Sequence, residues 1–268
     1  MRRTLAPFGR RLSTVTANEQ LGAYNLITAE DPDGPADPRP GQFYMLATAD
    51  GWGAGESERP YLPRAFSFAR ASGGLSFLLE AIGPGTDRLA GLEPGDGLWL
   101  TGPLGIGFAP PEPGTRPLLV GGGIGAAPLL CWQDELGPET KVLLGFRSAE
   151  HAEAANLFAG GPGIATDDGS VGREALVTEL LREELDLSTV NCQPSTVYAC
   201  GPPQMLEAVR ALCAERDVPA QLALESGMAC GFGACFGCVV PLADGGYARL
   251  CVDGPVLAGD AIAEVPAH

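Results

Sequence analysis

The N-terminal third of the chain alternates short apolar and β-branched runs with clusters of glycine, proline and aspartate. Such runs are typical of short β-strands separated by tight turns. The pattern predicts a brief helix at residues 86–92 and strands at 13–17, 24–28, 42–47, 65–69, 75–82 and 98–101. Short strands joined by turns favour a small antiparallel β-barrel. We therefore expect a first domain over residues 1–110.

From Arg116 onward, apolar strands alternate with helical stretches. The predicted strands are 117–120, 142–146, 164–165 and 196–200, and the predicted helices end at 136 or cover 152–158, 173–185 and 202–216. Repeated strand–helix units predict an α/β domain with a doubly wound parallel sheet, whose ligands bind beyond the carboxyl ends of the strands. This domain is expected over residues 111–222, which leaves 223–268 as a small C-terminal lobe.

Composition and charge narrow the class of function. The 268 residues suffice for two domains and a small third lobe. A net charge of −16 disfavours non-specific binding of nucleic acid. No stretch reaches the ~18 apolar residues of a membrane span, and no signal peptide follows the N-terminal arginines. The scattered cysteines Cys131, Cys192, Cys200 and Cys213 are typical of reduced thiols and predict a cytoplasmic protein.

Four cysteines near the C-terminus form the most specific motif. Cys230, Cys235, Cys238 and Cys251 are spaced C-x4-C-x2-C-x12-C, which is the plant-type iron–sulfur arrangement. Glycines among them suit a loop that wraps a cluster, because glycine accepts positive φ and lets N–H groups approach sulfur. The spacing predicts a 2Fe-2S cluster. A structural zinc site, disulfides and a thioredoxin-like C-x-x-C are the alternatives.

Two segments of the predicted barrel have residues that suit an anionic ligand. Arg64, Phe66 and Ser67 bring a cation, an aromatic ring and a hydroxyl to the start of one strand. Gly85 and Thr86 lie where another strand meets a helical turn, and a helix N-terminus capped by threonine can bind phosphate. A surface arginine and an ordinary turn would give the same patterns, so both interpretations stay open.

The α/β domain has three loops of interest. Gly121, Gly123 and Gly125 follow a buried strand, although Pro128 breaks the G-x-G-x-x-G pattern of dinucleotide-binding loops. Residues 167–170 either hydrogen-bond a ribose or form an Asx turn. Cys200 ends another strand and either faces a nicotinamide or is an ordinary core cysteine.

The order of barrel, α/β domain and cysteine loop resembles that of the ferredoxin-reductase-like flavoproteins. More closely, the chain is similar to the electron-transfer subunits of dihydroorotate dehydrogenase B. The resemblance covers nearly the whole chain, and its motifs are residues 41–43, 64–67, 85–86, 102–105, 121–128, 166–170, 200–202 and 228–238. The last motif, directly after a nucleotide-binding domain, is the most specific.

The resemblance implies an NAD-linked iron–sulfur flavoprotein oxidoreductase subunit. FAD is expected on the barrel, NADH on the α/β domain, and a 2Fe-2S cluster that exchanges electrons with FMN in a separate catalytic subunit. The cysteine loop is then expected to be the docking surface of a heterotetramer that converts dihydroorotate to orotate in pyrimidine biosynthesis.

The resemblance also assigns residues. Those along FAD are Arg64, Phe66 and Ser67, with Gly85 and Thr86 at its pyrophosphate. Those lining the NAD site are Gly121, Gly123, Gly125, Cys200, Gly201 and Pro202. Those holding the cluster are Cys230, Cys235, Cys238 and Cys251. No catalytic acid or base is expected, and the two histidines, His151 and His268, receive no role.

Two features depart from the family pattern. Ala65 stands where family members usually have proline, and residues 50–60 look like an insertion without a counterpart. The alternative functions are an electron-transfer subunit of another NAD(P)H-linked complex, of the hydrogenase or sulfide-linked type, and a non-catalytic zinc-binding interaction module. The sequence leaves the choice between NADH and NADPH open.

Overall fold

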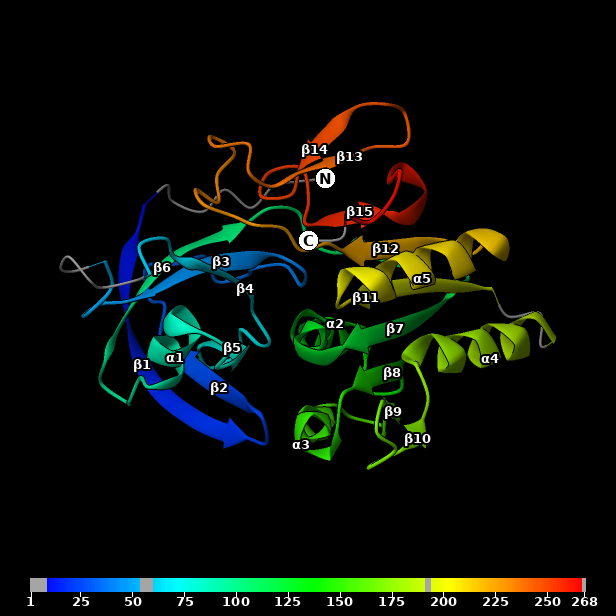
Figure 1. Cartoon of the computed structure of the whole chain (residues 1–268), viewed down its shortest axis with the longest axis horizontal. Coiled ribbons are helices and arrows are strands. Elements are labelled where there is room, and N and C mark those ends of the chain that lie inside the picture. The colour runs from blue at the N-terminus through cyan, green and yellow to red at the C-terminus, as the bar shows by residue number, and fades with distance from the viewer. Residues whose placement is uncertain (1–8, 54–59, 191–193, 267–268) are drawn as a thin grey trace.

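The computed structural model describes residues 9–53, 60–190 and 194–266. Cys192, His268 and residues 54–59 of the predicted insertion lie outside these ranges. Figure 1 shows a β-barrel on one side, an α/β layer beside it, and a small lobe built by the C-terminal part of the chain above both.

The N-terminal barrel contains the six predicted strands. They are β1 (Arg11–Leu21), β2 (Tyr24–Ala29), β3 (Phe43–Thr48), β4 (Arg64–Ser67), β5 (Leu75–Glu80) and β6 (Gly97–Leu104). The sheet order is β4-β3-β6-β1-β2-β5, with antiparallel neighbours throughout. The two outer strands approach each other where Ala69 N donates to Ser76 O and Ser76 N donates to Arg70 O. The helix α1 (Pro84–Ala90) follows β5.

The interior of the barrel is aromatic. Tyr44, Phe68 and Phe77 are fully buried, and the ring of Tyr44 packs edge-on against both phenylalanines. Edge-to-face contacts of this kind stabilise the aromatic core beyond the area that they bury. The packing fixes the positions of β3 and β5, from which the site residues extend.

The α/β layer has a seven-stranded sheet in the order β10-β9-β8-β7-β11-β12-β15. Its strands are β7 (Arg116–Gly122), β8 (Lys141–Phe146), β9 (Gly163–Thr166), β10 (Arg173–Glu174), β11 (Ser195–Cys200), β12 (Ala220–Ala223) and β15 (Val256–Ala258). All neighbours are parallel except β15, which pairs antiparallel with β12.

Helices lie on both faces of this sheet, as Figure 1 shows. They are α2 (Ala126–Leu136) and α3 (Ala149–Ala152) on the side of the barrel, and α4 (Val177–Val190) and α5 (Pro203–Glu215) on the opposite side. Buried residues of α2, such as Leu129 and Trp132, share one core cluster with Tyr24 and Leu78 of the barrel. Barrel and sheet are therefore packed directly against each other.

Three details differ from the predicted elements. The helix expected from Arg173 begins only at Val177, because Arg173 and Glu174 pair with β9 as strand β10. The helix expected at 152–158 is α3 followed by a 3-10 turn, Glu153–Leu157. β12 and β15 were not predicted at all, since each is a short segment that becomes a strand only by pairing with its neighbour.

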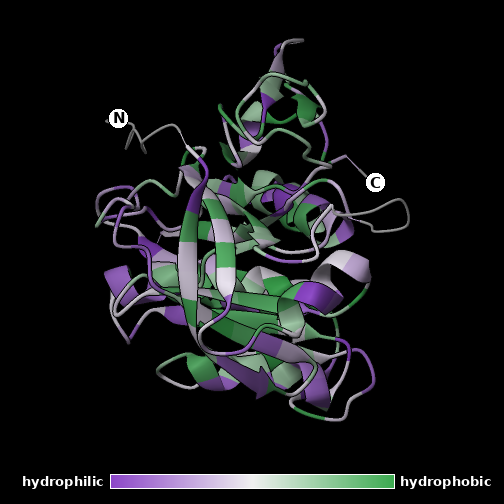
Figure 2. Ribbon diagram, turned by 90° about the vertical axis from the view of Figure 1, so that its left-hand side faces the viewer, coloured by the Kyte–Doolittle hydropathy of each residue, from purple (hydrophilic) through white to green (hydrophobic). Residues whose placement is uncertain are grey.

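The C-terminal lobe holds the hairpin β13 (Val239–Pro241) and β14 (Tyr247–Arg249), followed by the 3-10 turn Gly259–Ala261. Its buried residues, including Val240 and Leu250, belong to the same core cluster as Phe43 and Met45 of the barrel. Figure 2 shows hydrophobic residues on the interior strands and hydrophilic residues on the outer helices and loops. Within the described ranges, no helix is both long enough and apolar enough to cross a membrane.

Candidate functional site

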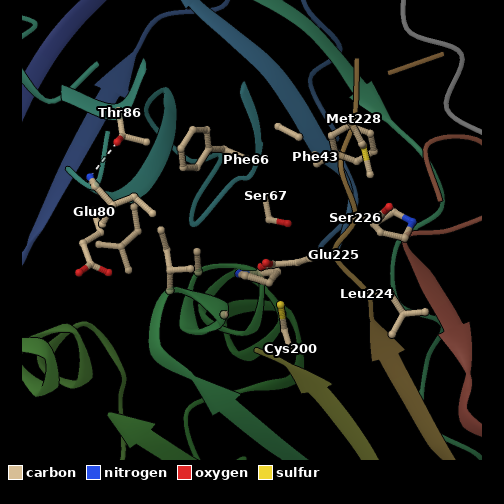
Figure 3. Close-up of a pocket in the computed structure, with 18 residues that line it drawn as sticks. Phe43, Phe66, Ser67, Glu80, Thr86, Cys200, Leu224, Glu225, Ser226 and Met228 are labelled. Atoms are coloured by element: carbon tan, nitrogen blue, oxygen red, sulfur yellow. Dashed lines mark hydrogen bonds between the residues drawn. The ribbon is translucent and has the colours of Figure 1, made fainter. Parts of the chain in front are cut away.

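A cavity of about 260 Å³ lies where the barrel, the α/β sheet and the start of the C-terminal lobe meet. Figure 3 shows side chains from all three parts directed into it. Of the residues singled out from the sequence, Phe66, Ser67 and Thr86 reach it from the barrel, and Gly125 and Cys200 from the sheet. The fold thus brings together residues that are far apart in the chain.

Arg64 and Gly85 lie beside each other next to this cavity. A Cβ atom on Gly85 would come within 2.8 Å of Arg64 Nε, so the glycine lets the guanidinium cross the start of α1. Arg64 also donates a hydrogen bond to Leu62 O at 2.9 Å and lies 5.9 Å from the centre of the Trp52 ring. The arginine is therefore held at the start of α1 by its neighbours in the barrel.

The hydroxyl of Thr86 organises the turn between β5 and α1. Thr86 Oγ1 accepts hydrogen bonds from Ile82 N at 2.9 Å and from Gly83 N at 3.0 Å. Backbone N–H groups at a helix start have no partner within the helix, so a side-chain acceptor there stabilises the turn. This arrangement keeps the wall of the cavity in one conformation.

We expect Thr86→Val to lower the free energy of unfolding by about 0.5–2 kcal/mol, the usual effect of losing a helix cap. The occupancy of the flavin that the sequence predicts at this turn should fall as well, because the turn that lines the cavity loses both of its side-chain acceptor contacts. Thermal unfolding and the absorbance ratio of flavin to protein measure the two effects. Thr86→Ser keeps the hydroxyl and should behave as the wild type; equal losses in both variants would contradict this role.

A second cavity, of about 570 Å³, lies over the carboxyl ends of the parallel strands. Gly123, Gly201 and Pro202, all predicted to line a nucleotide site, form part of its wall together with Arg147 and Asp167. Open α/β sheets bind ligands at this edge.

Gly121 and Gly125 have packing roles beside these cavities. A Cβ atom on Gly121 would meet Leu144 Cδ2 at 2.7 Å, and one on Gly125 would meet the carbonyl oxygen of Cys200 at 2.3 Å. Gly125 therefore requires glycine, because its close neighbours are backbone atoms, whereas a side chain at Gly121 would have to displace the ends of Leu144 and Leu129. With glycine at position 125, the loops that follow β7 and β11 can contact each other.

The two aspartates after β9 have different environments. Asp168 Oδ1 accepts hydrogen bonds from Ser170 N at 3.0 Å and Ser170 Oγ at 2.6 Å, which is an Asx turn. The hydrogen bonds from Ser170 lower the pKa of the Asp168 carboxyl. Asp167 lines the second cavity instead, so it is the aspartate positioned to meet a ligand.

The two cavities share the residues Glu80, Ile124 and Glu225. Cys200 faces the first cavity beside this junction (Figure 3). Burial raises the pKa of the Cys200 thiol well above its usual value, and the nearby Glu225 carboxylate raises it further. Cys200 is thus a neutral thiol at neutral pH, next to a place where two ligands would come into contact.

The sulfur atoms of the cysteine loop form two pairs. Cys238 Sγ and Cys251 Sγ lie 3.3 Å apart and are buried, while the Cys230 and Cys235 side chains contact each other nearer the surface. Burial acts to raise the pKa of the Cys230 thiol, but hydrogen bonds from Cys235, Phe232 and Ala234 outweigh it and bring the pKa to about 6. Burial, reinforced by Cys238, raises the pKa of Cys251.

This donor set suits a 2Fe-2S cluster. Two irons take four cysteine thiolates, and N–H groups directed at the sulfurs stabilise the thiolate form. Ala234 N and Cys235 N lie 3.3 and 3.4 Å from Cys230 Sγ, and Gly237 N lies 3.5 Å from Cys235 Sγ. In the described part of the chain, no three His, Cys, Asp or Glu side chains are grouped to hold a metal ion, and this includes the four loop cysteines, which lie as two pairs.

The cysteine loop begins at the wall of the first cavity. Ser226 and Met228 line that cavity, and Cys230 follows two residues later. A Cβ atom on Gly231 would come within 2.8 Å of the Met45 side chain, so this glycine packs tightly on strand β3 of the barrel. The loop therefore lies against the same strand that supplies Phe43 to the cavity.

Comparison with known proteins identifies the family. The sequence model of the iron–sulfur cluster binding domain of dihydroorotate dehydrogenase B matches residues 225–263. The electron transfer subunit of dihydroorotate dehydrogenase B (NAD(+)) from Desulforamulus reducens is 36% identical over 229 residues, which cover 81% of this chain and 84% of the relative. The subunit of the same name from Geobacillus thermodenitrificans is 39% identical over 237 residues, with coverages of 83% and 86%. The chain belongs to the family of dihydroorotate dehydrogenase B electron transfer subunits.

Solved structures confirm the predicted fold of this family member. The structure of an NADH-dependent reduced ferredoxin-NADP oxidoreductase superposes with a TM-score of 0.75 at 23% identity and covers 95% of this chain and 90% of that chain. The ferredoxin reductase of carbazole 1,9a-dioxygenase gives a TM-score of 0.61 at 22% identity, with coverages of 78% and 66%. These structures confirm the predicted combination of barrel and α/β domain, and the family model over residues 225–263 confirms the iron–sulfur lobe.

Sequence reasoning missed several residues that this family member presents to its cavities. Glu80, Glu225, Tyr24 and His151 all line the second cavity. Glu80 is the last residue of an apolar strand, and a charged residue at the end of such a strand could have indicated a position that contacts a ligand. Glu225 stands directly before the cysteine loop but carries no recognisable spacing of its own.

Proposed function

We propose that this chain passes electrons between NADH and an FMN-containing dihydroorotate dehydrogenase catalytic subunit, through FAD and a 2Fe-2S cluster. The observation that carries the proposal is the continuity of three sites: two cavities that share Glu80, Ile124 and Glu225, and a cysteine loop that starts at the wall of the first cavity. Membership of the electron transfer subunit family supports the same conclusion.

The order of the cofactors follows from their electron chemistry. NADH gives up two electrons together as hydride, the cluster takes one electron at a time, and a flavin between them supports both kinds of transfer. The residues proposed to surround FAD are Arg64, Phe66, Ser67, Gly85 and Thr86, with Gly125 and Cys200 at the same cavity. Those proposed to bind NAD are Gly123, Gly201 and Pro202, with Asp167 toward a ribose. Those proposed to hold the cluster are Cys230, Cys235, Cys238 and Cys251.

The residues of this chain would bind and orient the flavin and the nicotinamide and keep water away from the contact between them. Phe66, Ile124 and Met228 give the first cavity apolar walls, and the neutral thiol of Cys200 adds no charge to them. Apolar walls exclude water from the contact between flavin and nicotinamide and so favour direct transfer over leakage of electrons to solvent. Acid–base catalysis on the pyrimidine belongs to the partner, which releases two electrons and two protons as dihydroorotate becomes orotate.

Exposed aromatic side chains surround the cysteine loop and form the proposed docking face. Phe232, Phe236 and Tyr247 are 53%, 61% and 73% exposed. The Arg249 guanidinium lies 5.5 Å from the centre of the Phe236 ring. Exposed apolar groups gathered around one feature are typical of an interaction site, and aromatic residues and arginine are enriched at interfaces. This face would bring the cluster close to the FMN of the partner in a heterotetramer. The cytoplasmic location of the complex stays a prediction.

The proposal is tested by anaerobic addition of NADH to the purified chain, followed by visible and EPR spectroscopy. We expect the flavin absorption to bleach and a reduced 2Fe-2S signal to develop. The chain alone should pass electrons from NADH to an artificial acceptor but should not convert dihydroorotate. A colourless protein without flavin, iron or acid-labile sulfide would refute the cofactor assignment, and orotate formation by the isolated chain would refute the subunit assignment. Mass spectrometry of the co-purifying chain tests the identity of the partner.

A further inference from the structure

Glu80 connects the barrel to the α/β layer at the junction of the two cavities. It is the last residue of β5, and its Oε1 accepts a hydrogen bond from Arg147 at 2.6 Å, beyond the end of β8. The same oxygen lies 3.4 Å from His151 Nε2 in α3. The Glu80 side chain is 23% exposed, so the carboxylate is partly shielded from water. Glu80, a residue of the barrel, thus places its carboxylate at the interface with the α/β layer and in the wall of the second cavity.

The position of the Glu80 carboxylate is fixed from several sides. His151 Nδ1 lies 2.9 Å from Ser148 Oγ, and the His151 ring packs edge-on against Tyr24 at 5.7 Å between ring centres. The His151 ring therefore bridges Ser148 and Glu80, with one ring nitrogen toward each side chain. Ala23 N also donates to Glu150 O at 3.2 Å, which holds the β1–β2 turn against the start of α3. The contacts to Arg147 and His151, and the packing of the two elements around them, therefore hold the Glu80 carboxylate in one place.

The shared residues mark where nicotinamide meets flavin. Hydride transfer requires the reacting atoms to approach to about 3–3.5 Å. If FAD occupies the first cavity and NAD the second, as the proposed function requires, the two reacting rings can meet only at their common wall. Glu80, Ile124 and Glu225 form that wall. Glu80 is consequently at the nicotinamide end of the coenzyme.

We propose that Glu80 is a positioning residue that discriminates between the oxidised and reduced forms of the coenzyme by its charge. The nicotinamide ring of NAD⁺ is a cation, and that of NADH is neutral. A fixed carboxylate beside the ring attracts the cation and leaves the neutral ring unaffected. Arg147 offsets this attraction only in part, because its own side chain is 64% exposed and more strongly screened by water. Glu80 therefore favours NAD⁺ over NADH in the site.

The test compares Glu80→Gln with the wild type, both as the FAD-loaded, cluster-loaded chain. The amide oxygen of glutamine still accepts hydrogen bonds from Arg147 and His151, so the variant removes the charge and keeps the contacts. Dissociation constants are measured by flavin difference spectra for three probes: NAD⁺, 1,4,5,6-tetrahydro-NAD with a neutral ring that cannot transfer hydride, and ADP-ribose without a nicotinamide. We expect NAD⁺ binding to weaken about three- to tenfold relative to tetrahydro-NAD.

The choice of probes separates this role from a structural one. All three carry the same pyrophosphate, so any change in the charge balance of Arg147 cancels in the ratio of their dissociation constants. Glu150→Gln removes a neighbouring exposed carboxylate outside the cavities, and it should leave the NAD⁺ to tetrahydro-NAD ratio unchanged. An equal loss of affinity for all three probes in Glu80→Gln, or an unchanged ratio, would overturn the inference and identify Glu80 as an interdomain contact only.

The outcomes also separate this inference from the function on which it rests. A wild-type chain that binds none of the three probes refutes the proposed NAD site itself. A wild-type chain that binds all three, combined with an unchanged ratio in Glu80→Gln, refutes only the role of Glu80.

Discussion

Replacing Cys235 with serine is expected to separate the two halves of the electron path. Cys235 is the exposed member of the Cys230/Cys235 pair, and its own N–H contacts the Cys230 sulfur at 3.4 Å. Serine retains the shape but is a much weaker ligand for iron than a thiolate. Electron delivery to the catalytic partner should fall by more than the about 10- to 100-fold that is typical for loss of an outer-shell partner of a metal site. Oxidation of NADH by artificial dyes should persist in part, because the flavin and nucleotide cavities contain no atom of Cys235.

The measurements are iron and acid-labile sulfide content, the EPR signal of the reduced protein, and the two rates side by side. Cys213→Ala is the matched control, because Cys213 is buried in α5 and does not belong to the cysteine loop. The control should keep the cluster and the rate of delivery to the partner. Full delivery by Cys235→Ser in the absence of an iron–sulfur signal would show that electrons leave the chain by another route.

A methyl group added at Gly125 is expected to have the largest effect on stability. The new Cβ would lie 2.3 Å from the carbonyl oxygen of Cys200 and 2.6 Å from Gly201 N, both backbone atoms that a side-chain rotation cannot move aside. The loops after β7 and β11 would have to separate, at a cost of about 3 kcal/mol or more. In a chain of this length that lowers Tm by roughly 6–12 °C. The flavin and NAD cavities should both lose affinity, since Gly125 lines one and Gly201 the other.

Gly123→Ala provides the comparison within the same loop. Gly123 has a φ of +54°, yet the nearest atom to an added Cβ is Tyr24 Oη at 3.7 Å. The cost is then limited to the left-handed backbone conformation, about 1 kcal/mol. Thermal unfolding and flavin retention of the two variants measure the difference. Equal destabilisation would mean that backbone conformation, and not the close approach of Cys200, explains the requirement for glycine.

Much of the fold could be predicted because its signals are local. Alternating apolar residues and turn clusters located all six strands of the barrel, and the Gly121–Gly125 segment located the end of β7 and the turn that follows it. The prediction was wrong for Arg173 and Glu174 because helix-forming residues there are paired with β9. β12 and β15 were not predicted, and in the structure they are short strands that pair with each other at one edge of the sheet.

The candidate site was likewise predicted only in part from the sequence. The cysteine spacing and the flavin and nucleotide motifs could be recognised in the sequence, since each ligand type requires particular residues at short separations. The sequence did not predict how these residues are distributed between the two cavities. Gly125 and Cys200, which were assigned to NAD, line the cavity proposed for FAD.

The residues of the chain contain enough local information to predict three folding units, their order and the chemistry of the cysteine loop, because backbone propensity, turn geometry and ligand spacing act over a few residues. Only the packing of the barrel against the sheet brings Glu80 to Arg147, residues separated by 67 positions. That contact, and the wall that Glu80 shares with Glu225, depends on the burial of side chains between domains. The cysteine motif therefore predicted an iron–sulfur site, whereas the tertiary structure decided that this site begins at the wall of the cavity proposed for FAD.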